Sequence, residues 1–325
     1  MKIRKRLYTV LILLALAAFV PGFSQNPKSA EADDDEPMPT FKIVSEVNMV
    51  SVPVTVRKSD GSFFKGLTKS SFKILEDGKP QEIVFFTQEG LPTNVAMLLD
   101  ISGSVQSEWG AIKYSTKRFL ENLKPDDKFS LTTFNDEALL RVDWGRKIDL
   151  VDKKLSGIYC KGNTKLWDAI QLVCDELFKG IKDKKVIILI SDGLDNQSYY
   201  SDSDALEAAV RAETAIYIVS KTESIRRYYE YVYPNGSVPH GMFAQADAVM
   251  RRLAYKTGGR VLYPNGFGQL DDIYAEVDEE LRNQYTLGYI SSNKAKDGSY
   301  REIDVGVSEK NVMITARPGY YAPSK

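Results

Sequence analysis

The strongest constraint in this sequence is an uninterrupted apolar run, Val95-Ala-Met-Leu-Leu99, that ends directly on Asp100. Residues 186–190 and 215–219 form two further runs of this kind. Apolar residues without alternation are typical of strands that are buried on both faces of a parallel sheet. Helical spacing of apolar residues predicts helices near 105–123, 147–156, 165–179, 202–212, 244–257 and 268–283. Alternating strands and helices indicate an α/β fold, a doubly wound, mostly parallel sheet, over residues 91–283.

The segments on either side of this region, 41–90 and 284–325, have strand patterns and no helical one. Val50, Val52, Val54 and Val56 alternate along one long strand. Strands are also predicted at 72–76, 83–86, 285–290, 301–307 and 312–316, with the Asp77-Gly78 turn joining the first two as a hairpin. Neither half has enough strands for a core of its own. We therefore expect both halves to form one small, sandwich-like β domain into which the α/β domain is inserted.

The first 24 residues have the pattern of a secretory signal peptide. A basic start (Lys2 to Arg6) precedes an apolar stretch, Leu7 to Val20, and small residues flank a cleavage position before Gln25. The alternative is an uncleaved membrane anchor, but the apolar stretch is short for a full span. Residues 25–40 are acidic and polar, which predicts a disordered leader. We expect a secreted or periplasmic protein without stable membrane insertion after cleavage.

The charge balance excludes one class of partner. The chain has 43 basic and 44 acidic residues, and removal of the four basic residues of 1–24 leaves 39 against 44. A net charge of −5 argues against nucleic-acid binding, which requires a basic face. Export would permit a disulfide between the two cysteines, Cys160 and Cys174. The sequence leaves open whether they are bridged or are two partly buried thiols.

Three polar pieces follow predicted strands or precede a predicted helix, and their side chains offer only oxygen atoms. They are Asp100-Ile-Ser102-Gly-Ser104, the Thr164 of Gly162-Asn-Thr164, and the Asp192 of Ser191-Asp192-Gly193. In open α/β sheets, ligands bind at the carboxyl ends of the strands. Hydroxyl and carboxylate oxygens suit Mg²⁺, Mn²⁺ or Ca²⁺, and no soft ligand favours zinc.

These three pieces, in this order, resemble the metal-ion-dependent adhesion site of the von Willebrand factor A, or integrin I, family. The resemblance to the A-type domain covers about residues 92–283. The phrases Val52-Pro-Val-Thr-Val and Arg317-Pro-Gly-Tyr-Tyr resemble, in addition, secreted bacterial proteins with A-type-related domains. The resemblance implies that the five residues hold one divalent cation, with Mg²⁺ the expected ion. The ligand residues are then Asp100, Ser102, Ser104, Thr164 and Asp192.

The resemblance further implies a non-enzymatic adhesion or scaffolding module whose metal keeps one position open for a protein partner's Asp or Glu. Two carboxylates and three neutral hydroxyls leave the ion electrophilic, which is consistent with that role. The alternatives are a structural envelope protein with an empty site and a metal-dependent hydrolase. A hydrolase needs a general base, and His240 is the only histidine in the chain. A phosphatase-type nucleophile at Asp100 would need a second carboxylate where Ser102 stands.

Several tyrosines occur in segments that we expect near the predicted site. The connection 221–243 is long for a compact domain. It contains Arg226 and Arg227 beside several tyrosines, and two more tyrosines follow the third metal piece. Tyr and Arg are enriched at protein interfaces. We predict a partner-binding rim of Tyr199, Tyr200, Tyr228, Tyr229 and Tyr231, with a lid packed on its own domain as the alternative.

Overall fold

The computed structural model describes residues 49–88, 91–220 and 240–324. The predicted signal peptide, the leader and most of the 221–243 connection lie outside these ranges. Within them, no helix is both long enough and apolar enough to cross a lipid bilayer.

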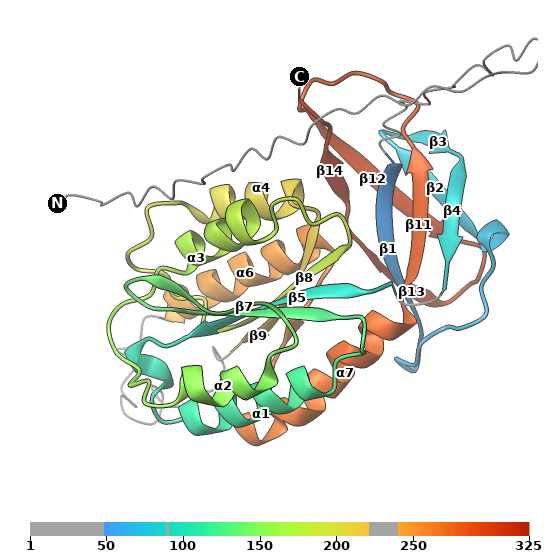
Figure 1. The fold of residues 1–325 in the computed structure, drawn as a ribbon. Coiled ribbons are helices and arrows are strands. Elements are labelled where there is room, and N and C mark those ends of the chain that lie inside the picture. The colour runs from blue at the N-terminus through green and yellow to red at the C-terminus, as the bar shows by residue number, and fades with distance from the viewer. Residues whose placement is uncertain (1–48, 89–90, 221–239, 325) are drawn as a thin grey trace, which may run out of the picture. The chain divides into compact units, whose positions relative to one another are not determined.

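A six-stranded sheet forms the centre of the α/β region (Figure 1). Its first five strands in spatial order are parallel, and only the edge strand β7 runs antiparallel, against β6. In spatial order the strands are β10 (Val261–Leu262), β9 (Thr214–Ser220), β8 (Lys184–Ser191), β5 (Thr93–Asp100), β6 (Lys128–Phe134) and β7 (Ala138–Gly145). This order confirms the predicted doubly wound, mostly parallel sheet.

Helices cover both faces of this sheet (Figure 1). One face carries α1 (Trp109–Glu121), α2 (Ile148–Leu155) and α7 (Leu270–Asn283). The other carries α3 (Leu166–Leu172), α4 (Asp202–Arg211) and α6 (His240–Thr257). A short turn, η2 (Gly103–Val105), comes before α1, and a wide turn, η3 (Val173–Leu177), continues α3, with the Phe178 amide donating to the Val173 carbonyl.

The apolar runs explain this layering. Along β5, Val95, Met97 and Leu99 belong to the core on the α1 side, while Ala96 and Leu98 belong to the core on the α3 side. Strand β8 divides its residues in the same way. Because both sides are packed, β5 and β8 have apolar residues along their interiors, and polar groups are left to their ends.

The remaining strands form the β module, defined here as β1–β4 with β11–β14. One sheet has the order β13-β1-β11-β4 and the other the order β14-β12-β2-β3, so each contains strands from both sides of the α/β region. This confirms the predicted fold class. Before the α/β region come β1 (Met49–Lys58), the turn η1 (Lys69–Ser71), β2 (Phe72–Glu76), β3 (Lys79–Gln81) and β4 (Ile83–Thr87). After it come β11 (Tyr285–Ile290), β12 (Tyr300–Val307), β13 (Val312–Ala316) and β14 (Gly319–Tyr321).

The predicted hairpin between 72–76 and 83–86 is wrong. The Asp77-Gly78 turn joins β2 to β3, and β4 pairs instead with β11 in the other sheet. Asp77 and Gly78 both have positive φ angles, of 47° and 77°, so they form the tight turn that the sequence predicts. The strand that pairs with β2 across this turn is β3, the nearer segment Lys79–Gln81. Its three residues show too little alternation to be recognised as a strand from the sequence.

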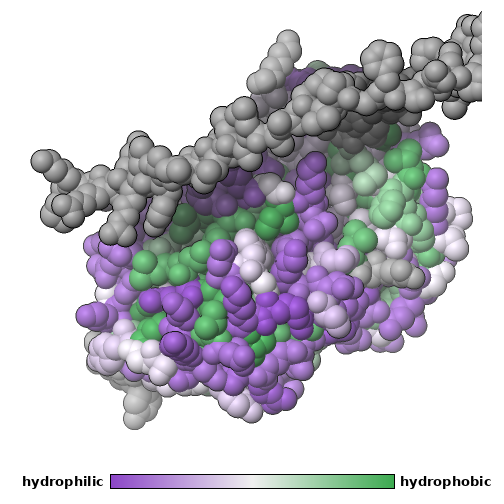
Figure 2. Space-filling view, in the orientation of Figure 1, coloured by the Kyte–Doolittle hydropathy of each residue, from purple (hydrophilic) through white to green (hydrophobic). Residues whose placement is uncertain are grey.

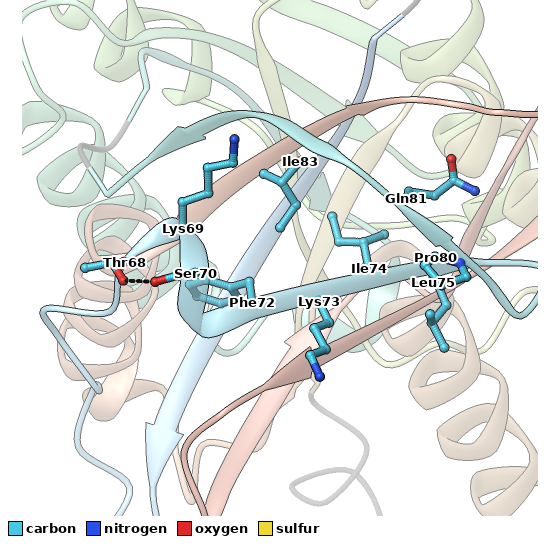
Figure 3. Close-up of a pocket in the computed structure, with 10 residues that line it drawn as sticks. All are labelled: Thr68, Lys69, Ser70, Phe72, Lys73, Ile74, Leu75, Pro80, Gln81 and Ile83. Carbon is cyan, nitrogen blue, oxygen red and sulfur yellow. Dashed lines mark hydrogen bonds between the residues drawn. The ribbon is translucent and has the colours of Figure 1, made fainter.

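The two sheets of the β module share one apolar core. Val52 and Leu287 of the first sheet and Ile74 of the second are buried in the same cluster. A pocket of about 720 Å³ lies at the edge of this core (Figure 3). Ile74 and Lys73 both line this pocket and point to opposite sides of β2. Figure 2 shows that hydrophilic residues cover most of the described surface on the side in view, with hydrophobic residues between them.

Glu280, on α7, connects the α/β region to the β module although it is only 1% exposed. Its Oε2 atom pairs with Arg57 of β1 at 2.9 Å and with Arg260 at 2.6 Å. Its Oε1 atom accepts hydrogen bonds from Thr55 of β1 and Tyr217 of β9. A buried carboxylate is tolerated only when it is paired and hydrogen-bonded in this way. The end of α7 is therefore held to both the central sheet and β1.

The first prediction concerns this carboxylate. Glu280→Gln should lower the free energy of unfolding by about 3 kcal/mol, because Arg57 loses the carboxylate that it pairs with and Arg260 loses one of its two. Urea denaturation followed by circular dichroism measures the loss. Glu279→Gln, the exposed neighbour, should change stability by less than about 0.5 kcal/mol. Equal losses in the two variants would contradict the assigned role.

The two cysteines, whose state the sequence leaves open, are not joined by a disulfide in the structure. Cys160 packs in the core on the α1 side of the sheet and Cys174 in the core on the α3 side, so the sheet separates them. Both are buried, and burial raises the pKa of the Cys174 thiol far above its usual value. Since the thiolate is the reactive form, the Cys174 side chain is not suited to chemistry at neutral pH.

A second prediction follows. Ellman's reagent at pH 8 should detect no thiol in the native protein and two after unfolding in guanidinium chloride without a reductant. Because the pKa of the Cys174 thiol lies above that of a free cysteine, raising the pH to 9 should not make this thiol react with the reagent. No thiol in the unfolded chain would demonstrate a disulfide and contradict the structure.

Candidate metal centre

Asp100, the last residue of β5, is completely buried and links two strand ends. Its Oδ1 atom accepts a hydrogen bond from the Ser102 amide at 2.8 Å. Its Oδ2 atom accepts one from the Ser191 hydroxyl at 3.0 Å, at the end of β8. Because β5 and β8 are adjacent and parallel, their carboxyl ends lie together. The first and third pieces of the predicted site therefore meet.

A second contact between the same pieces involves three of the predicted ligand residues. The Ser104 hydroxyl donates to Asp192 Oδ2 at 2.9 Å, and the hydroxyls of Ser102 and Ser104 are 3.2 Å apart. Ser102 and Asp192 are buried, with 4% and 3% of their surface exposed, whereas Ser104 is exposed. The cluster thus reaches the protein surface through Ser104.

Thr164 lies between α2 and α3, and its backbone amide and carbonyl bind Asn196, which follows the third piece. Its amide donates to Asn196 Oδ1 at 2.9 Å, and the Asn196 amide donates to the Thr164 carbonyl at 3.1 Å. Asn196 follows Asp192 by four residues. The structure therefore links Asp100, Ser102, Ser104 and Asp192 by hydrogen bonds and ties the Thr164 loop to the segment that contains Asp192.

Two supporting residues were not identified from the sequence. Ser191 is named in the sequence only as the neighbour of Asp192 in the third piece, yet its hydroxyl donates to Asp100. Asn196 holds the Thr164 loop, and no pattern in the sequence indicates this role. Asp195, two residues after Gly193, accepts hydrogen bonds at the start of α3, from the Leu166 amide at 2.8 Å and the Ser198 hydroxyl at 2.6 Å.

Exposed aromatic side chains lie near this cluster. Tyr199 is 89% exposed and Tyr200 47%, and the Asp168 carboxylate accepts a hydrogen bond from each of their amides. The ammonium group of Lys165, next to Thr164, lies 4.5 Å from the centre of the Tyr199 ring. Tyr159, in the same loop as Thr164, is 68% exposed and was not predicted. Tyr228, Tyr229 and Tyr231 lie outside the described residues.

The chemistry of the predicted ligand set fits a hard divalent cation. The side chains offer two carboxylates and three hydroxyls, which are ligand types of Mg²⁺, Mn²⁺ and Ca²⁺. In the part of the chain that the structure describes, no three His, Cys, Asp or Glu side chains are grouped to hold a metal. A site in this part would therefore depend on neutral hydroxyl oxygens beside Asp100 and Asp192.

Residues 95–194 match the family model described as the von Willebrand factor type A domain. This confirms the resemblance for the segment that contains all three pieces. No curated protein matches the chain.

Several solved structures are similar at low sequence identity. An aerotolerance-related membrane protein from Bacteroides fragilis NCTC 9343 is 13% identical, with coverage of 58% of this chain and 98% of that chain and a TM-score of 0.45. Proximal thread matrix protein 1 from the mussel byssus, with a zinc-occupied MIDAS motif, is 16% identical, with coverage of 65% and 50% and a TM-score of 0.48. A von Willebrand factor type A protein from Catenulispora acidiphila is 10% identical, with coverage of 86% and 75% and a TM-score of 0.45.

Proposed function

We propose that this chain is a metal-dependent protein-binding module that acts in adhesion or scaffolding. The observation that supports it most directly is the hydrogen bond from Ser104 to Asp192, because it joins the loop after β5 to the loop after β8. A hydroxyl and a carboxylate from two separate strand ends, beside Ser102 and the buried Asp100, are arranged as neighbouring ligands would be. The type A match supports the same reading.

In this proposal Asp100, Ser102, Ser104, Thr164 and Asp192 hold one divalent cation, with Mg²⁺ expected and Mn²⁺ or Ca²⁺ as alternatives. The cation supplies an electrophilic position for an Asp or Glu of a protein partner. Ser104 is the exposed member of the set, so the partner would approach from its side. Tyr199, Tyr200 and the Lys165 ammonium group would border that approach.

The proposed action is binding and not catalysis. The only histidine of the chain, His240, lies at the first residue of α6, and no sequence piece of the proposed site contains one. The signal-peptide pattern of residues 1–24 supports a secreted or periplasmic location. The domain limits proposed with it are 25–40 for the leader, 91–283 for the A-type domain, and 41–90 with 284–325 for the β domain.

The test is calorimetric titration of the chain with Mg²⁺ and Mn²⁺. The wild type should bind one ion, and Ser104→Ala should weaken binding by about tenfold, since one direct ligand is lost, or about 1.4 kcal/mol. Ser104 is exposed, so the variant should keep its stability. Ser107→Ala, an exposed serine of the following turn, is the matched control and should bind as the wild type does.

Two outcomes would contradict the proposal. Absence of any metal-dependent signal in the wild type would favour the structural alternative with an empty site. Equal affinities in Ser104→Ala and the wild type would place the ion elsewhere. Capture of envelope proteins by the wild type in Mg²⁺, abolished by a chelator and by Asp100→Ala, would identify the partner.

A further inference from the structure

A second candidate site lies at the opposite end of β8 from Asp192. It is a cavity of about 480 Å³, within the range of small-molecule pockets. The starts of β8 and β9 form one wall, and β1 and β11 form another with residues that face away from the core of the β module. The seven residue steps from Lys184 to Ser191 place it about 23 Å from the proposed metal centre.

Positive charge predominates in the lining of this cavity. Four cationic side chains, Arg317, Lys182, Lys184 and Lys185, oppose two carboxylates, Asp183 and Glu213. The difference is two positive charges. A cavity with low-dielectric walls and a net positive charge attracts an anion.

Arg317 has hydrogen-bonding capacity that the protein does not use. Its Nη2 atom donates to the Ser51 carbonyl at 2.7 Å and pairs with Glu213 at 3.0 Å. Its side chain is only 7% exposed, and its Nε and Nη1 atoms are buried without a hydrogen-bond partner among the described residues. An unpaired buried donor on a charged group is costly, and an anion that accepts from it would remove that cost.

The two lysines at the start of β8 donate hydrogen bonds to backbone carbonyls. The Lys184 ammonium donates to the Leu281 carbonyl at 3.2 Å, and that of Lys185 to the Ile181 carbonyl at 3.1 Å. Neither forms an ion pair with a carboxylate in the described ranges. Burial lowers the pKa of Lys184 to about 8 and also lowers that of Lys185, so their charged forms are held at a cost.

Part of the remaining lining is apolar. Met49, Phe85, Leu91 and Pro92 contribute to the wall formed by β1, β4 and the segment before β5. A free inorganic anion would leave these side chains without a partner. A ligand that contacts both the cationic and the apolar side chains of the cavity needs one anionic group and an apolar body.

We propose that this cavity binds a small organic carboxylate, with the carboxylate directed to Lys185 and Arg317 and the apolar body against Phe85 and Leu91. This site is independent of the proposed metal function. Neither the type A match, which ends at residue 194, nor the sequence pattern of Arg317-Pro-Gly assigns a ligand here.

Binding of sodium benzoate to the full chain at pH 7 tests the proposal, by NMR chemical shifts and calorimetry at constant ionic strength. Benzyl alcohol, which has the same apolar body without charge, and inorganic phosphate, which has charge without the body, are the comparison probes. Benzoate should bind saturably and shift the amides of Gly258 and Thr286, which line the cavity. Both comparison probes should bind at least about tenfold more weakly.

Variants locate the binding. Lys185→Met should weaken benzoate binding by about tenfold, while Lys128→Met, an exposed lysine at the same edge of the sheet, should leave it unchanged. Arg317→Lys keeps the charge and removes the unpaired donors, so it should also weaken binding, and circular dichroism checks that each variant folds. No saturable benzoate binding, phosphate binding as tight as benzoate, or no effect of Lys185→Met and Arg317→Lys would overturn the proposal.

Discussion

The burial of β5 and β8 on both faces is the constraint on which the other features depend. Apolar residues occupy every interior position of these strands, with alternate side chains in two separate cores. Polar and charged groups that need partners are therefore confined to the strand ends. At the carboxyl ends this gives the cluster of Asp100, Ser191 and Asp192, and at the start of β8 it gives Lys184 and Lys185. Both proposed sites lie where the sheet stops being apolar.

The second constraint comes from the insertion of the α/β region between strands of one module. Strands β4 and β11, which flank that region in the chain, pair with each other. The two points at which the chain passes between the β module and the α/β region therefore lie side by side. Apolar burial holds the interior of each part, while the contact between the parts contains charges. Glu280 balances Arg57 from β1 and Arg260 from the α/β region at one point. This junction fixes α7 relative to β1 and forms the boundary near which the cationic cavity opens.

The sequence predicted features in which many residues share one pattern. The doubly wound sheet, the helices on its two faces and the long strand of Val50 to Val56 all follow from periodicity that extends over several residues. The pairing of β2 was predicted wrongly because both Lys79–Gln81 and Ile83–Phe86 are within reach of the Asp77-Gly78 turn, and only packing of β4 against β11 decides between them. Strand β14, at three residues, is too short for any pattern to appear.

The proposed metal residues were found because hydroxyl and carboxylate side chains stand at fixed places after apolar runs, whereas the supporting contacts depend on the fold. The Ser191 hydroxyl reaches Asp100 only because β5 and β8 are neighbours, and Asn196 reaches Thr164 only because two loops pack together. These supports have a chemical consequence. Asp100 already accepts two hydrogen bonds, and Asp192 accepts one from the Ser104 hydroxyl and one from the Leu194 amide, so part of their charge is engaged before a cation arrives. A cation held by carboxylates that are shared in this way would keep more of its own charge for an incoming partner carboxylate, which is the property that a binding site of this kind requires.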